Sequence, residues 1–164
     1  MKVACIQLTS GENYNKNVKN IILYIKKSIS NNADLIITPE VSSLITKNKN
    51  LLDKFTFKMS EDPLLHKIKL ISKKYKKWIL IGSIISKSGN KLKNRSIVVN
   101  PSGKIIKYYD KINMFDVKLN KNEIYKESKT YSSGNKLVSV KLPWGNLGLT
   151  ICYDLRFPEL FRKL

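Results

Sequence analysis

Residues 147–164 read LGLTICYDLRFPELFRKL, in which an apolar run ends at Cys152 and a charged turn follows at once. A run that breaks in this way predicts a buried strand whose last residue lies at the carboxyl edge of a sheet, beside a helix N-terminus. The helix dipole and the free backbone N–H groups at such a place favour a thiolate over a thiol. Cys152 is therefore a candidate nucleophile, and the alternative is a small buried hydrophobic residue.

The chain before this segment alternates predicted helices and strands. Residues 18–29 carry valine and isoleucine at helical spacing with lysines between them, which predicts an amphipathic helix. A second helix is predicted over 62–77, because Asp62 suits the N-cap and Pro63 suits the first helical position. Apolar runs and turn signals predict strands at residues 2–9, 33–38, 78–86, 96–100, 104–109, 137–143 and 147–152.

These elements predict one α/β domain with a mixed sheet, because both crossover helices and hairpin turns join the strands. Turn residues at 88–90, 101–103 and 144–146 mark the hairpins. The stretch 110–136 is polar and is expected to be irregular. At 164 residues the chain is long enough to bury a core of its own.

Charge is the most unusual feature of the composition, with a net value of +19 at pH 7. The chain holds 28 lysines but three arginines, and the lysines are spread along its length. Arginine is the residue favoured for bidentate contacts with phosphate and guanine. The pattern therefore favours a solvated lysine surface, and a basic nucleic-acid-binding module is the less favoured alternative.

Export, membrane insertion, disulfides and metal binding are not expected. The chain has no apolar run of about 18 residues, and its first residues lack the apolar core of a signal peptide, so a cytoplasmic location is predicted. Cys5 and Cys152 are far apart, and the sequence has one histidine and no CxxC pair. Two reduced thiols and no structural zinc site follow from this pattern.

A nucleophilic cysteine needs a base, and histidine is the usual one. His66 follows Leu65 in the apolar stripe of a predicted helix, which favours a partly buried surface residue over a catalytic one. Glu40 follows a short buried strand closed by Pro39, and desolvation there raises a carboxyl pKa toward the working range of a general base. Its alternative role is that of a loop residue that caps the segment after it.

Lys111 is the third candidate because of its surroundings. It follows a predicted strand and lies among Ile112, Met114 and Phe115 rather than among other lysines and asparagines. A buried ammonium at this position would stabilise an oxyanion and lower the pKa of a nearby thiol. The alternative is a lysine at a strand end whose charged head reaches solvent.

Together these segments resemble one family of enzymes. The motifs MKVACIQLTS (1–10), ADLIITPE (33–40), YYDKINMFDV (108–117) and GLTICYDLRFPEL (148–160) occur in the order typical of the nitrilase superfamily of carbon–nitrogen hydrolases. The catalytic set of that superfamily is Glu, Lys and Cys. The resemblance spans nearly the whole chain and includes the three candidate residues Glu40, Lys111 and Cys152.

The resemblance implies a role for each matching residue. Glu40 is similar to the general base of the superfamily, Lys111 to its transition-state lysine, and Cys152 to its nucleophile. Glu127, in YKESKTYSSG, resembles the second glutamate that orients the lysine and the substrate. The backbone N–H of Tyr153 is expected to bind the oxyanion beside Lys111. No metal and no organic cofactor are implied.

The motifs look most like those of the Nit group, which includes ω-amidases and amidases of deaminated glutathione. This group usually has His where the chain has Asn113, and often a basic residue where it has Asp110. The implied reaction cleaves a small carboxylate-bearing linear amide to a carboxylate and ammonia through a cysteine thioester. Hydrolysis of an N-carbamoyl amide or of a nitrile is the alternative within the superfamily.

The resemblance also implies an architecture. Members of that superfamily are expected to form a four-layer αββα sandwich of roughly 260 to 280 residues. A chain of 164 residues is too short to form all of it. Residues 1–164 are therefore expected to be the N-terminal part of a single carbon–nitrogen hydrolase domain whose C-terminal remainder is absent, and to be inactive alone. A homo-oligomer is expected for the full-length protein, with no nucleic-acid or membrane partner.

Overall fold

A five-stranded mixed sheet forms the centre of the computed structural model, which describes residues 1–121 and 123–164. The strands lie side by side in chain order: β1 (Val3–Cys5), β2 (Leu35–Thr38), β3 (Trp78–Ser88), β4 (Lys91–Val99) and β5 (Ile105–Asp110). The first three are parallel, and β4 and β5 continue the sheet as antiparallel hairpins. The mixed sheet that the sequence predicts is confirmed.

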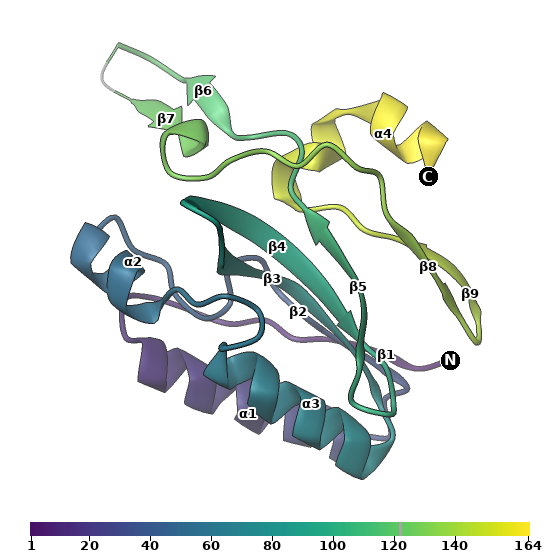
Figure 1. Cartoon of the computed structure of the whole chain (residues 1–164). Helices are drawn as coiled ribbons and strands as arrows, with labels where there is room; N and C mark the ends of the chain where they lie inside the picture. Colours follow the sequence, from purple (N-terminus) through teal and green to yellow (C-terminus); the bar gives the residue numbers. More distant parts are fainter. Residues whose placement is uncertain (122) are drawn as a thin grey trace.

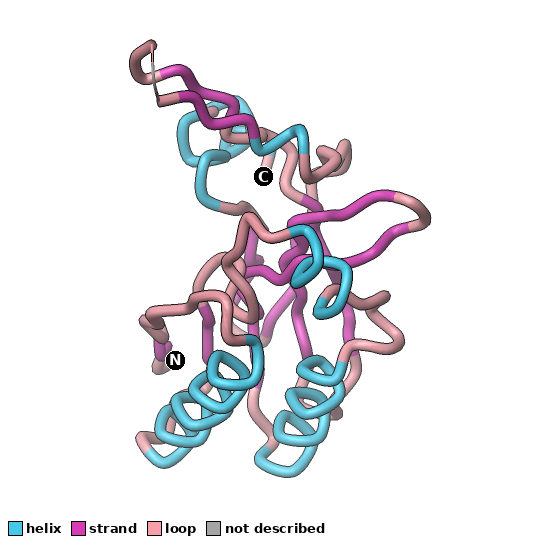
Figure 2. Tube along the Cα trace, turned by 90° about the vertical axis from the view of Figure 1, so that its left-hand side faces the viewer, coloured by secondary structure: helices cyan, strands magenta, loops and turns pink. Residues whose placement is uncertain are grey.

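Three helices provide the crossovers between the parallel strands: α1 (Tyr14–Ser30) after β1, and α2 (Lys49–Phe55) and α3 (Pro63–Tyr75) after β2. Helix α3 begins as predicted, because the Asp62 carboxylate accepts hydrogen bonds from the N–H groups of Leu64 and Leu65 at 2.8 and 3.0 Å. Helices α1 and α3 lie side by side and cover one face of the sheet (Figures 1 and 2). Helix α2 was not predicted.

Apolar side chains fill both faces of the main sheet. On the helical face, Ile21 and Ile25 of α1 and Ile68 of α3 pack against the strands and are fully buried. On the other face, Val98 and Tyr109 pack against the last strands of the chain in a second cluster. Within the described ranges, no helix is long and apolar enough to cross a membrane.

In its described residues, the C-terminal half of the chain adds two hairpins, two 3₁₀ turns and one short α-helix. They are β6 (Asp116–Lys118) with β7 (Ile124–Lys126), β8 (Ser139–Leu142) with β9 (Gly145–Gly148), a 3₁₀ turn at Glu127–Lys129, a second 3₁₀ turn at Cys152–Arg156 and α4 (Pro158–Lys163). The hairpin β8–β9 lies on the face of the main sheet opposite α1 and α3 (Figure 1).

Two predictions about this half were wrong. The stretch 110–136 is not wholly irregular, because β6 and β7 pair in register from Asp116 with Lys126. Strand β9 ends at Gly148, well before Cys152. Residues 149–151 stay apolar because Leu149 and Ile151 are buried in the second core cluster, so their hydrophobicity reflects packing rather than strand pairing.

Candidate active site

Four of the five candidate residues line one cavity of about 530 Å³. Glu40 follows β2, Lys111 follows β5, Glu127 follows β7, and Cys152 begins the second 3₁₀ turn. These segments are distant in sequence, and the fold brings their functional groups together at one end of the main sheet. The fifth candidate, Tyr153, is the next residue of the same turn.

The ammonium of Lys111 lies between the two carboxylates. Its Nζ atom is 3.0 Å from Oε1 of Glu40, 3.0 Å from Oε1 of Glu127 and 2.8 Å from Oε2 of Glu127. The Lys111 side chain is 2% exposed, whereas those of Glu40 and Glu127 are 31% and 13% exposed. The interpretation of Lys111 as a snorkelling lysine is therefore wrong.

Two opposing effects set the pKa of Lys111. Burial is the largest single effect and lowers this pKa, but hydrogen bonds to Glu127 and the charge of Glu40 together outweigh it and hold the pKa above its ordinary value. The side chain is thus a fixed positive charge at neutral pH. A cation in this place can stabilise negative charge that develops on a reacting atom.

Ser83 holds the backbone on both sides of Glu40. The Ser83 hydroxyl accepts a hydrogen bond from Val41 N–H at 2.8 Å, and the Ser83 N–H donates to the carbonyl of Pro39 at 3.2 Å. Ser83 lies where the β3–β4 register shifts, between Ile81 and Ile84. Such bulges often adjoin functional sites because they redirect a short piece of backbone.

The turn that carries Glu40 is tight and strained. Val41 has φ +46°, a left-handed conformation that is rare for a β-branched residue. At Gly82, a Cβ atom would lie 2.1 Å from the carbonyl oxygen of Thr38, so no other residue fits without moving the backbone. These features fix where the Glu40 side chain begins.

The backbone of Lys111 is held from two sides. Its N–H donates to the carbonyl of Asn94 at 2.9 Å, and its carbonyl accepts from the N–H of Gly134 at 2.7 Å. A Cβ on Gly134 would lie 2.2 Å from the carbonyl oxygen of Asp110, so this close approach requires glycine. Side chain and main chain of Lys111 are both fixed by hydrogen bonds.

The buried carboxylate of Asp154 joins the Lys111 segment to the Cys152 turn. One oxygen accepts from the hydroxyl of Tyr109 at 2.7 Å and from Ile151 N–H at 2.9 Å. The other accepts from the backbone and side-chain N–H groups of Asn113 at 2.9 and 2.8 Å. Asn113, where the Nit group usually has His, thus serves here as a link between the two segments.

Cys152, the candidate nucleophile, is exposed. Its φ of +47° lies in the left-handed region, so its backbone is strained. Although the residue is exposed overall, partial burial of the thiol is the largest effect that raises its pKa. The negative charge of Glu40 raises this pKa further, and the charge of Lys111 lowers it by less. The predicted preference for a thiolate is wrong. The turn of five residues is too short to act as a helix dipole, and the Glu40 carboxylate lines the same cavity as the sulfur.

Tyr153 places its ring outside the cavity. The ring packs edge-on against Phe115 at 5.1 Å and against Phe157 at 5.5 Å between centroids. Hydrogen bonding within the 3₁₀ turn starts with Asp154 N–H, which donates to the carbonyl of Ile151 at 3.1 Å. The N–H groups of Cys152 and Tyr153 precede it, so the turn itself does not use them.

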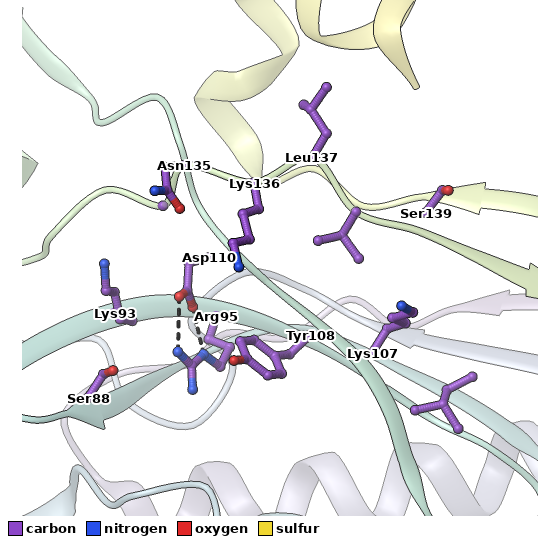
Figure 3. Close-up of a pocket in the computed structure, with 13 residues that line it drawn as sticks. Ser88, Lys93, Arg95, Lys107, Tyr108, Asp110, Asn135, Lys136, Leu137 and Ser139 are labelled. Atoms are coloured by element: carbon purple, nitrogen blue, oxygen red, sulfur yellow. Dashed lines mark hydrogen bonds and ion pairs between the residues drawn. The ribbon is translucent and has the colours of Figure 1, made fainter.

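Two other features of the sequence lie outside this cavity. His66 is exposed on α3. Asp110, next to Lys111, turns to Arg95 and forms a bidentate ion pair with distances of 2.6 and 3.0 Å. The pair lines a separate cavity of about 640 Å³ together with Tyr108, whose ring lies under the guanidinium (Figure 3). The departure from the Nit pattern at Asp110 therefore faces another part of the molecule.

Nearly the whole chain is similar to known proteins. The family model described as carbon-nitrogen hydrolase matches residues 2–164. The chain belongs to the carbon–nitrogen hydrolase family. A deaminated glutathione amidase of Yersinia enterocolitica is 36% identical to this chain over 166 residues, which cover 99% of the chain and 57% of that protein. The omega-amidase NIT3 of Saccharomyces cerevisiae is 30% identical over 169 residues, which cover 98% of this chain and 57% of that protein.

Solved structures show the same fold. The NitFhit protein of C. elegans has a TM-score of 0.84 and 26% identity, covering 96% of this chain and 39% of its own. Nit3 of Saccharomyces cerevisiae has a TM-score of 0.78 and 26% identity, and the match covers 98% of this chain and 58% of the Nit3 chain. The predicted nitrilase-like fold class and the resemblance to the Nit group are confirmed. The chain spans 57% of the length of both curated relatives.

The raised pKa of Cys152 predicts a slow alkylation of this thiol at neutral pH. In a Cys5→Ser background, the rate of reaction with iodoacetamide should rise with pH to a midpoint above the ordinary thiol range, because the thiolate is the reactive form. Glu40→Gln removes a charge that raises this pKa, so its midpoint should lie at lower pH. Mass spectrometry of the alkylated chain measures the midpoint of each variant. A fully reactive thiolate at neutral pH would contradict the expectation.

Proposed function

We propose that the whole protein is an amidase that cleaves a small carboxylate-bearing linear amide to a carboxylate and ammonia, with a thioester on Cys152 as intermediate. The observation that carries this proposal is the placement of Glu40, Lys111, Glu127 and Cys152 around one cavity. The names of the relatives from Yersinia and yeast, a deaminated glutathione amidase and an omega-amidase, support the reaction class.

The first half of the reaction forms the thioester. Glu40 takes the proton of the neutral Cys152 thiol as the sulfur attacks the amide carbon. The carbonyl oxygen becomes an oxyanion, which the ammonium of Lys111 and the N–H of Tyr153 stabilise. Glu40 then gives its proton to the amide nitrogen, the carbon–nitrogen bond breaks, and ammonia leaves.

The second half returns the enzyme to its starting state. Glu40 takes a proton from water, and the hydroxide attacks the thioester carbon through a second oxyanion at the same place. The carbon–sulfur bond then breaks, and the sulfur regains a proton from Glu40. The carboxylic acid product leaves and loses its proton to solvent, which gives the carboxylate. Glu127 accepts hydrogen bonds from Lys111 throughout and keeps the ammonium beside the reacting carbon.

A neutral thiol in the resting state suits this sequence of steps. The charges of Lys111, Glu40 and Glu127 already sum to one negative charge, and a thiolate would add a second. The site therefore favours proton transfer from sulfur to Glu40 at the moment of attack rather than a standing ion pair. This differs from cysteine hydrolases in which a histidine holds the thiolate.

The cavity lining supports a carboxylate-bearing substrate. Lys47 and Lys126 line the same cavity as the reacting groups, and both are exposed. Their positive charges would attract a negatively charged end of the amide away from the reacting carbon. A substrate with a carboxylate therefore fits this cavity better than a neutral amide of equal length does.

A substrate panel tests the proposal. The purified whole protein is offered a short ω-amide with a terminal carboxylate, the neutral amide of equal length, an N-carbamoyl amide and a nitrile, and ammonia release is followed. We expect the carboxylate-bearing amide to have a kcat/KM at least about tenfold above that of the neutral amide. Preferred turnover of the nitrile or the N-carbamoyl compound would overturn the substrate assignment.

A further inference from the structure

Asn94 lies at the centre of the active-site cluster, although neither the motifs nor the proposed mechanism uses it. It belongs to β4 and is 1% exposed. Its Nδ2 donates to Oε1 of Glu40 at 2.8 Å and to Oε1 of Glu127 at 3.2 Å. Nζ of Lys111 lies 3.0 Å from each of the same two oxygens. Two donors thus bridge one pair of carboxylate oxygens.

This arrangement makes the two oxygens of Glu40 unequal. Within residues 1–121 and 123–164, both nitrogen donors that reach the Glu40 carboxylate end on Oε1. Cys152 lines the same cavity as Glu40, and the Glu40 carboxylate acts on the pKa of its thiol. A carboxylate whose first oxygen accepts two bonds has its plane fixed, and its second oxygen is left for a proton from the thiol or from water.

We propose that Asn94 is a positioning residue that, together with Lys111, holds Oε1 of Glu40 so that Oε2 is the oxygen that exchanges protons during the reaction. The proposal rests on the proposed function, because it assigns the atom of Glu40 that acts as base. Asn94 does not touch the reacting carbon or sulfur and acts through Glu40.

The chemistry of the side-chain amide supports this role. The –NH₂ group supplies two hydrogens, one for each carboxylate, and brings no charge of its own. The opposite amide orientation would place Oδ1 against two carboxylate oxygens at 2.8 and 3.2 Å, so the contacts fix the assignment of nitrogen and oxygen.

The other end of the amide argues against a purely structural role. Oδ1 of Asn94 is buried and has no hydrogen-bond partner among the described residues. A buried acceptor without a partner lowers stability relative to an apolar side chain of the same shape. The benefit of asparagine at this position therefore lies in what its nitrogen does to the two glutamates.

Several charged or titratable groups surround the Glu40 carboxylate, and each can affect a pH profile of the site. The ammonium of Lys111 and the carboxylate of Glu127 belong to the hydrogen-bonded cluster around Glu40. Burial, and then the charges of Glu127 and Glu40, raise the pKa of Tyr131 to about 12. The other charged or titratable groups among the described residues that line the cavity are Lys47, Tyr125, Lys126 and Cys152.

The test compares Asn94→Ala with Asn94→Asp in a Cys5→Ser background. Asn94→Ala frees the Glu40 carboxylate to rotate, so we expect kcat to fall about 10- to 100-fold while KM changes less than about threefold. The alkylation midpoint of Cys152 should move to lower pH, because a rotating Glu40 carboxylate raises the pKa of the thiol less than a fixed one does. Unchanged kcat and an unchanged midpoint in this variant would overturn the proposal.

Asn94→Asp keeps the shape of the side chain and serves if the alanine variant does not fold. Its extra negative charge beside both glutamates should raise the alkylation midpoint and move the acid limb of the kcat/KM profile to higher pH by about one unit. An unchanged midpoint would contradict the role of Asn94. Alkylation needs no turnover, so a wild-type protein without amidase activity would defeat the proposed function and still allow this test.

Discussion

Replacement of Cys152 by alanine in the whole protein should abolish ammonia release from the preferred amide, with kcat/KM lower by about 10⁴-fold or more. The reason is that the proposed reaction passes through a covalent bond to this sulfur. Cys5, the second cysteine, lies on β1 and does not line the cavity, so it offers no substitute. A coupled ammonia assay and intact-mass detection of the acylated wild-type enzyme make the measurement.

Two controls separate loss of chemistry from loss of fold. Alanine has a Cβ like cysteine, so the strained φ of +47° persists and the unfolding midpoint of the Cys152→Ala protein should match that of the wild type. Cys5→Ser should retain full turnover and show that thiol loss alone has no effect. Ammonia release by Cys152→Ala at the wild-type rate would rule out the thioester mechanism.

The sequence predicted the parts of the site that carry their own local signal. Glu40 follows an apolar strand closed by Pro39, and Lys111 follows a strand amid apolar neighbours, so both stood out in a chain with 28 lysines. The resemblance to a known family added Glu127, which lies in a polar segment with no signal of its own. The structure shows these three charges in contact, as such a set requires.

Asn94 and Ser83 were missed because their roles depend on tertiary contacts. Asn94 belongs to the segment LKNRS, which has the polar composition of a hairpin flank, and its burial arises only when Glu40 and Glu127 fold over it. Ser83 interrupts an apolar strand but gives no hint of the bulge it occupies. Hydrogen bonds between segments more than 30 residues apart leave no periodic trace in a sequence.

The thiolate prediction failed for a related reason. A cysteine after an apolar run and before a charged turn predicts the start of a helix, and the sequence cannot show that the turn stops after five residues as a 3₁₀ element. It also cannot show that the Glu40 carboxylate lines the same cavity as the sulfur. Burial and Glu40 outweigh Lys111 in raising the pKa of Cys152, and that balance is decided by positions in space.

Lys111→Met should lower both activity and stability by large amounts. Without the ammonium, the oxyanion loses its cation, and kcat/KM should fall about 10³-fold. The variant also leaves the carboxylates of Glu40 and Glu127 facing each other with Asn94 alone between them, and removal of one member of a buried ion pair destabilises a protein by about 3 kcal/mol. Urea unfolding at neutral pH and steady-state kinetics measure the two effects.

The stability loss of Lys111→Met should depend on pH in a defined direction. Without the cation, the two carboxylates repel each other in the folded state when both are charged, and this repulsion is relieved when one of them takes up a proton. The folded state of the variant therefore gains stability relative to the unfolded state as pH falls. The deficit relative to wild type should therefore be largest at neutral pH and shrink toward about pH 4, near the ordinary carboxyl pKa.

Arg95→Met is the matched control, because it breaks another largely buried ion pair outside the site. The Arg95 and Asp110 side chains are 9% and 17% exposed, and the pair lines the separate cavity (Figure 3). Its loss should lower stability by a similar amount while kcat/KM falls less than about tenfold. If both variants lost activity equally, the effect of Lys111 would be one of stability alone. A loss of activity confined to Lys111→Met would place the cation at the reacting oxygen.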